Sequence, residues 1–329
     1  MPVFFRSFPF LLVMFVIAVA CRADGGEPDP DDPKAAEAEA PPLNPRAPKA
    51  PEEPTKDAEP IPPPQSPSKL EYAWTDAGAT DPTNSLSARI PPPESYQRQA
   101  VLTDSFAHWL RGLPLFEGRP QVKLYDGGSK GNQRAHHAVV DIDVGKRDLQ
   151  QCADAVMRLR AEYLWSAGRA DDVHFNFTSG DKASWSAWRK GVRPVIQGNK
   201  VSWATKAKAD SSHAGFRRYL DKVFTYAGSS SLSRELKNVA DEPIEIGDIF
   251  IQGGFPGHAM LVVDVAVKAS TGARVFLLTQ SYMPAQQIHV VVNPNDADLS
   301  PWYQAPIPAQ LRTPEWSFNA ADRKRFAEE

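Results

Sequence analysis

Short apolar runs alternate with polar residues through the last third of the chain. Four such runs cover residues 246–251, 259–267, 275–282 and 288–292, and turn residues separate them. A period of two, with many Val, Ile and Phe residues, is typical of strands, and close spacing favours antiparallel neighbours. Shorter strands are predicted at 121–125, 137–143 and 173–177, with a hairpin at 195–203 that turns at Gly198 and Asn199.

Helical periodicity dominates two longer segments. One face of a helix from Leu149 to about Trp165 carries Leu149, Cys152, Val156, Leu159 and Tyr163. Asp148 and Gln151 are expected to form a capping box at its start. Other helices are predicted at 105–111 after Asp104, at 184–190 and at 213–226. Because helices precede closely spaced strands, the sequence predicts an α+β fold, with an antiparallel sheet packed with helices.

The first seventy residues show neither pattern. An apolar run from Phe8 to Ala20 follows a single charge, Arg6, and ends in small residues, which is typical of a cleavable signal peptide over 1–20. The run is too short for a comfortable membrane span. Residues 18–21, Ala-Val-Ala-Cys, resemble a bacterial lipobox, which implies lipidation of Cys21; ordinary cleavage is the alternative. Arg22 stands where an Asp often marks inner-membrane retention, so the resemblance favours an outer-membrane lipoprotein facing the periplasm or the surface.

Composition divides the rest of the chain. Residues 21–68 are rich in Pro, Ala and acidic residues and have almost no large apolar ones, which predicts a disordered tether. A single domain is expected over 69–305, followed by a tail over 306–329. The domain is close to neutral, so nothing indicates nucleic-acid binding. His136 and His137 alternate across a strand and no zinc-type spacing occurs, so we expect no metal and no cofactor.

The chain has only two cysteines, Cys21 and Cys152. If Cys21 carries lipid, Cys152 is an unpaired thiol in an exported protein. Such a thiol is either a buried small hydrophobe or a reactive group. Cys152 falls in the first turn of its helix, where free N–H groups and the helix dipole favour a thiolate. The sequence leaves both interpretations open.

Gly247-Asp248 opens one predicted strand and Gly257-His258 opens the next. This pair of strands resembles the papain-like amidases of CHAP and NlpC type, in which that His is the base of a Cys–His pair. The start of the helix at 213 resembles the position of their nucleophile, but His213 stands there. The resemblance implies a papain-like cysteine-peptidase fold.

Longer stretches resemble a bacterial family known as domain of unknown function 4846. The shared stretches are 148–155, 158–163, 224–228, 256–259 and 280–286. The resemblance covers nearly the whole predicted domain and implies no established activity.

The candidate catalytic residues are Cys152 as nucleophile and His258 as base. Gln150 or Gln151 could donate to an oxyanion, and His289, Gln280 or Asp264 could orient the base. Candidate ligand-binding residues are Gln280, Tyr282, Trp185 and Trp188, because aromatic and amide groups suit sugars or peptides.

Three functions follow. The first is a lipid-anchored cysteine hydrolase that cuts amide bonds, for example in cell-wall peptide. The second is a non-catalytic module that binds a peptide or glycan in the same cleft. The third is a structural envelope lipoprotein.

Overall fold

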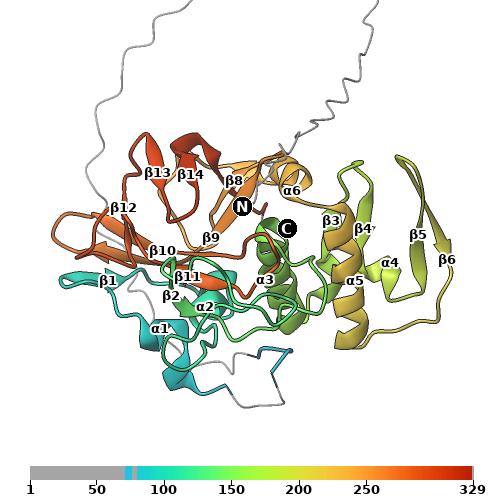
Figure 1. Ribbon diagram of the computed structural model, residues 1–329, viewed down its shortest axis with the longest axis horizontal. Helices are drawn as coiled ribbons and strands as arrows, with labels where there is room; N and C mark the ends of the chain where they lie inside the picture. The colour runs from blue at the N-terminus through green and yellow to red at the C-terminus, as the bar shows by residue number, and fades with distance from the viewer. Residues whose placement is uncertain (1–70, 76–79, 328–329) are drawn as a thin grey trace, which may run out of the picture. The chain divides into compact units, whose positions relative to one another are not determined.

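An antiparallel sheet forms the centre of the computed structural model, which describes residues 71–75 and 80–327 (Figure 1). The predicted signal segment, the tether and Cys21 lie outside these residues. Within the described residues, the sheet runs in the order β2 (His136–Val139), β11 (His289–Val291), β10 (Arg274–Gln280), β9 (His258–Lys268), β8 (Ile249–Gln252), β15 (Arg323–Arg325), β7 (Lys237–Asn238). Two more strands, β1 (Tyr96–Arg98) and β12 (Tyr303–Ala305), pair with β9 and β10. The predicted α+β fold with an antiparallel sheet is confirmed.

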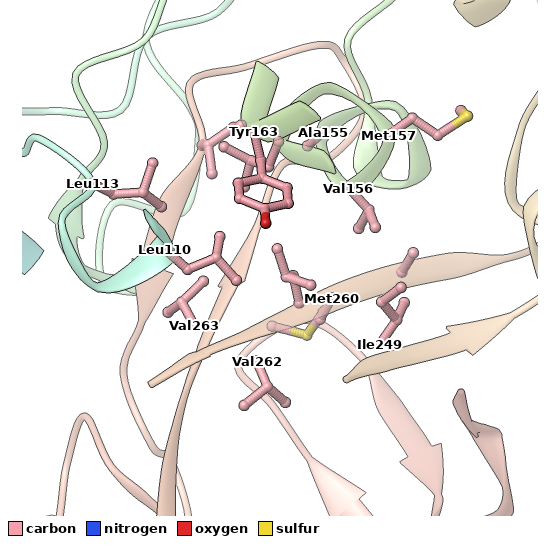
Figure 2. Packing of buried hydrophobic residues seen from close by; sticks show 14 of the residues in the cluster. Leu110, Leu113, Ala155, Val156, Met157, Tyr163, Ile249, Met260, Val262 and Val263 are labelled. Atoms are coloured by element: carbon pink, nitrogen blue, oxygen red, sulfur yellow. The ribbon is translucent and has the colours of Figure 1, made fainter. Parts of the chain in front are cut away.

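Helix α3 (Cys152–Ser166) packs across β9 on one face of the sheet. Its apolar residues, among them Val156, meet Ile249 and Met260 in the core that Figure 2 shows. Helix α2 (Phe106–Arg111) covers the next part of the same layer, and α1 (Leu86–Arg89) follows the short turn η1 (Pro82–Asn84). The predicted helix at 149–165 is thus confirmed, three residues shorter at its start.

Aromatic rings from the C-terminal residues pack on β8 and β10. The ring of Phe318 lies 5.9 Å from Phe250, and that of Tyr303 lies 5.7 Å from Phe276. Phe318 belongs to a hairpin of β13 (Gln310–Arg312) and β14 (Ser317–Asn319), after which η3 (Ala320–Asp322) leads into β15. The folded region therefore continues beyond residue 305, where the sequence suggested that a tail begins.

A second group of elements packs around α5 (His213–Tyr226). It contains two hairpins, β3 (His174–Asn176) with β4 (Lys182–Ser184), and β5 (Val192–Gln197) with β6 (Lys200–Thr205). Helix α4 (Trp185–Trp188) joins the hairpins, η2 (Ala170–Asp172) precedes them, and α6 (Ser229–Glu235) follows α5. The predicted hairpin around Gly198 and the predicted helix at 213–226 are confirmed.

Two local expectations differ from the structure. Residues 121–125 form only isolated bridges, Lys123 to Ser129 and Leu124 to Gln286, and a turn with Gly127 at positive φ follows them. The capping partner of Gln151 is Asp154, whose Oδ2 accepts from the Gln151 N–H at 3.1 Å, rather than Asp148. Among the described helices, none is both long and apolar enough to cross a bilayer.

Candidate active site

His258 begins β9, directly after a glycine-rich loop. Gly257 has no room for a side chain there, because a Cβ would lie 2.5 Å from both the Gly254 carbonyl oxygen and Ser229 Oγ. This tight passage sets the imidazole at the end of the sheet, where it is 1% exposed. Burial lowers the pKa of His258 to about 4. The ring is therefore neutral at physiological pH.

A side-chain amide on the neighbouring strand holds the His258 ring. Nε2 of His258 lies 2.9 Å from Oε1 of Gln280, and Nε2 of Gln280 donates to Oε2 of Glu315 at 2.7 Å. Since Gln280 donates to Glu315, its oxygen faces His258 and accepts the Nε2 proton. Nδ1 of His258 is then the atom that can take up a proton, as a general base needs.

Two charged residues and a second histidine complete this network. Nζ of Lys130 donates to Glu315 at 2.7 Å, and both side chains are largely buried. His289 donates from Nδ1 to the Gln287 carbonyl, so its Nε2 can accept from Gln280 at 3.2 Å. Burial lowers the pKa of His289 to about 3. The result is a chain of oriented groups that ends at His258.

Cys152 is the first residue of α3, and its thiol contacts the backbone of Ala259 at the start of β9. The backbone N–H groups of Ala259, Ala153 and Cys152 itself favour the thiolate, as expected for a helix start. Burial and the nearby Asp154 carboxylate outweigh them and raise the pKa of the thiol to about 11. The expectation of a thiolate at Cys152 is therefore not met in the resting structure, because desolvation is the larger effect.

The structure brings Cys152 and His258 to the same end of the sheet. The thiol meets the backbone of Ala259, which follows His258, and the Tyr282 ring lies 4.9 Å from the His258 ring. Burial, Glu315 and Cys152 together raise the pKa of Tyr282. Among the described contacts, no hydrogen bond joins the thiol of Cys152 to the imidazole of His258. The thiol and the imidazole therefore lie at the same end of the sheet without a hydrogen bond between them.

The remaining candidates divide between this site and the core. Gln151 donates from Nε2 to Asp148 at 3.0 Å, and the buried Gln150 donates from Nε2 to the Asp143 carbonyl oxygen at 3.3 Å. Each side-chain amide already donates within the protein, so the backbone N–H groups around the Cys152 sulfur are the stronger candidates to stabilise an oxyanion. Asp264 of β9 is fully buried, and its carboxylate pairs with the guanidinium groups of Arg98 and Arg111, at 2.6 Å from each. These ion pairs join β9 to β1 and α2.

Three other residues lie outside the site. Trp185 and Trp188 are buried in α4, where both rings pack on Tyr219. His213 starts α5 and pairs with Glu162 at 2.8 Å. The helix start that contacts β9 is therefore that of α3, which carries Cys152, and not that of α5.

Sequence reasoning missed Lys130, Glu315, Trp316 and Phe318. The rings of Trp316 and Phe318 lie 5.3 Å and 5.9 Å from that of His258 and shield it. These residues come from loops and the C-terminal hairpin, where no periodicity marks them. Within the part of the chain that the structure describes, no group of three or more His, Cys, Asp or Glu residues could hold a metal ion.

One family model matches the chain. It is described as domain of unknown function 4846 and matches residues 86–325. No curated protein and no solved structure resembles the chain closely enough to count as a match. The predicted family is confirmed, whereas the papain-like resemblance stays a prediction.

Proposed function

Starting from the fact that this chain belongs to the family of domain of unknown function 4846, we propose that it is a cysteine hydrolase of amide bonds. Cys152 is the nucleophile, His258 is the base and Gln280 orients the base. The hydrogen bond from His258 Nε2 to Gln280 Oε1 carries this proposal. It leaves Nδ1 as the proton acceptor, on the residue that precedes Ala259, whose backbone N–H meets the Cys152 thiol.

The reaction starts from a neutral thiol and a neutral imidazole. The thiol proton passes to Nδ1 of His258 as the sulfur attacks the carbonyl carbon of the substrate. The carbon–nitrogen bond then breaks, the leaving amine takes the proton from His258, and an acyl thioester remains on Cys152. Water, deprotonated by His258, hydrolyses the thioester and restores the thiol. The N–H groups of Ala153 and Ala259 are the candidates to stabilise the developing oxyanion.

Two loops at the same end of the sheet favour a peptide as substrate. Phe255, before His258, is 94% exposed, and Met283, after Tyr282, is 51% exposed. Large apolar side chains at the edge of a site suit apolar side chains of a peptide. A glycan-linked cell-wall peptide fits the expected location of the protein, which we propose to be exported and held by lipid on Cys21.

Alkylation kinetics test this proposal. The rate of iodoacetamide reaction at Cys152 is measured against pH in the native protein, in His258→Ala and in Cys152→Ser. A hydrolase predicts that the native thiol reacts, that His258→Ala slows the reaction at neutral pH at least tenfold, and that Cys152→Ser abolishes it. A thiol that reacts only after denaturation, and equally in both His258 forms, would exclude the hydrolase.

A second candidate function is a non-catalytic module that binds a peptide or glycan. The raised pKa of Cys152 and the missing thiol–imidazole bond favour it. In that case Tyr282, Met283 and Phe255 contact the ligand and Cys152 only fills space. Cys152→Ala would then leave binding of a peptidoglycan digest unchanged, whereas Phe255→Ala would weaken it.

A further inference from the structure

One segment of the folded region concentrates positive charge. From Lys182 to Lys208 the chain contains seven Lys or Arg residues and no Asp or Glu. This segment holds β4, α4, β5 and β6, and three of its lysines, Lys200, Lys206 and Lys208, lie in β6 or directly after it. Elsewhere in residues 71–329, acidic residues outnumber basic ones. The positive charge is therefore a property of this segment and not of the whole domain.

Most of this charge is free to meet a partner. Lys190, Lys200, Lys206 and Lys208 are exposed, and no carboxylate of the described residues lies within 4.0 Å of their ammonium groups. The two arginines are engaged within the protein. Arg189 pairs with Asp171 at 2.6 Å, and the guanidinium of Arg193 lies 3.8 Å from the centre of the Trp188 ring. The lysines thus form the accessible part of the charge.

An aromatic residue, Trp203, lies between Lys200 and Lys206 in the sequence. Trp203 is 38% exposed although one side of its ring stacks on Phe177 at 5.9 Å. It pairs across the hairpin with Pro194, and Val201 pairs with Ile196 on the same face. The hairpin is therefore a two-stranded ribbon with apolar side chains and a partly exposed indole on one face. Lys200 lies on its other face, and Lys206 and Lys208 directly follow β6.

This arrangement matches the chemistry of a bilayer surface. Lysines are stabilised electrostatically next to anionic headgroups, and tryptophan prefers the headgroup level, where part of its ring lies in apolar surroundings. Figure 1 shows β5 and β6 at the right-hand margin of the domain, beyond α4 and α5. The hairpin forms a sheet of its own, separate from the central sheet. It can therefore touch a flat surface without changing the candidate active site.

We propose that the β5–β6 hairpin binds the anionic surface of a lipid bilayer, through the lysines and Trp203. This interaction is independent of the proposed hydrolysis, since it uses none of the residues around Cys152. Its effect would be to hold one end of the domain against a membrane, in addition to any lipid on Cys21.

Vesicle sedimentation tests the proposal. The purified full-length chain is mixed with vesicles of phosphatidylcholine, with or without phosphatidylglycerol, at low and high salt. The variant K200Q/K206Q/K208Q is compared with K123Q/K146Q/K237Q, which removes the same charge from exposed lysines elsewhere. We expect the first variant to lower partitioning into anionic vesicles roughly tenfold or more, and the second to change it less than about threefold.

Comparison of the two lysine variants removes the contribution of the apolar N-terminal segment, because both variants keep that segment, with Arg6, unchanged. Equal losses in both variants, or equal binding to neutral vesicles, would overturn the proposal. A soluble polyanion such as dextran sulfate serves as the other arm. If it binds the hairpin as tightly as the vesicles do and Trp203→Gln changes neither, the partner is an anionic polymer and the membrane assignment is wrong.

Discussion

Nε2 of His258 and Oε1 of Gln280 lie 2.9 Å apart, on neighbouring strands and almost completely shielded from water. The contact joins the end of β10 to the start of β9. Gln280 is itself held by Glu315, a residue of the C-terminal hairpin. The orientation of the imidazole therefore depends on residues that are far apart in the sequence, and each link can be tested separately.

The pair of Lys130 and Glu315 is predicted to stabilise the folded protein only as a pair. Glu315→Gln leaves a buried ammonium without its counter-charge, and we expect a loss of about 3 kcal/mol in the free energy of unfolding. Lys130→Met with Glu315→Leu removes both charges and should cost less than Glu315→Gln alone. Urea unfolding of the three proteins measures this. A double variant that costs the sum of two independent losses would contradict the pairing.

The glycine-rich loop before His258 is predicted to tolerate no side chain at Gly257. Gly257→Ala places a Cβ 2.5 Å from backbone and side-chain oxygens, so the loop must move, at a cost of roughly 1–3 kcal/mol. Gly131→Ala is the matched control, because a Cβ there meets nothing within 4 Å. It should leave the unfolding midpoint unchanged or slightly raised. Similar midpoints for the two variants would show that the loop is not close-packed.

Periodicity was enough to predict strands β8 to β11 and the positions of Cys152 and His258. Cys152 marks a helix start and His258 a strand start, and both signals are local. Gln280 could be named as a candidate for the same reason, but its choice over Asp264 could not be made. That choice depends on which strands pair and which face each residue occupies, and only the folded chain fixes these.

Burial was the main quantity that sequence could not supply. A helix start predicts a thiolate, yet Cys152 is half-buried beside the start of β9, and desolvation reverses the sign of the pKa shift. The helical spacing of Trp185 and Trp188 is compatible with a ligand-binding surface and with a core. Only the structure shows that α5 covers both rings. Lys130 and Glu315 lie in segments without a repeating pattern, so their contact across 185 residues has no local signal.

The buried Trp185 and the partly exposed Trp203 should differ sharply in their contribution to stability. Trp185 is 1% exposed and packs on Phe216 and Tyr219, so Trp185→Ala should cost about 3–5 kcal/mol. Trp203 keeps part of its ring in solvent, so Trp203→Ala should cost about 1 kcal/mol. Thermal or urea unfolding measures both. A small loss for Trp185→Ala would return that residue to the ligand-binding candidates.

The buried histidines predict a specific loss of stability in acid. Burial lowers the pKa of His258 to about 4 and of His289 to about 3, from an ordinary value of 6.5. The unfolded chain therefore binds these protons first as the pH falls. The stability that the two neutral rings contribute is fully present above pH 6.5. It is lost as the pH falls toward 4 for His258 and toward 3 for His289, by about 3 kcal/mol for each ring at pH 4.

The test is the urea midpoint at neutral pH and near pH 4.5, for the native protein, His289→Gln and His108→Gln. His289→Gln should lower stability at neutral pH but lose about 2 kcal/mol less than the native protein on acidification, because it no longer has that ring to protonate. His108, a half-buried helix residue, serves as the control, and its variant should follow the native protein. If His289→Gln loses as much stability in acid as the native protein, the ring is not held neutral by burial, and the hydrogen-bond chain to His258 needs a different assignment.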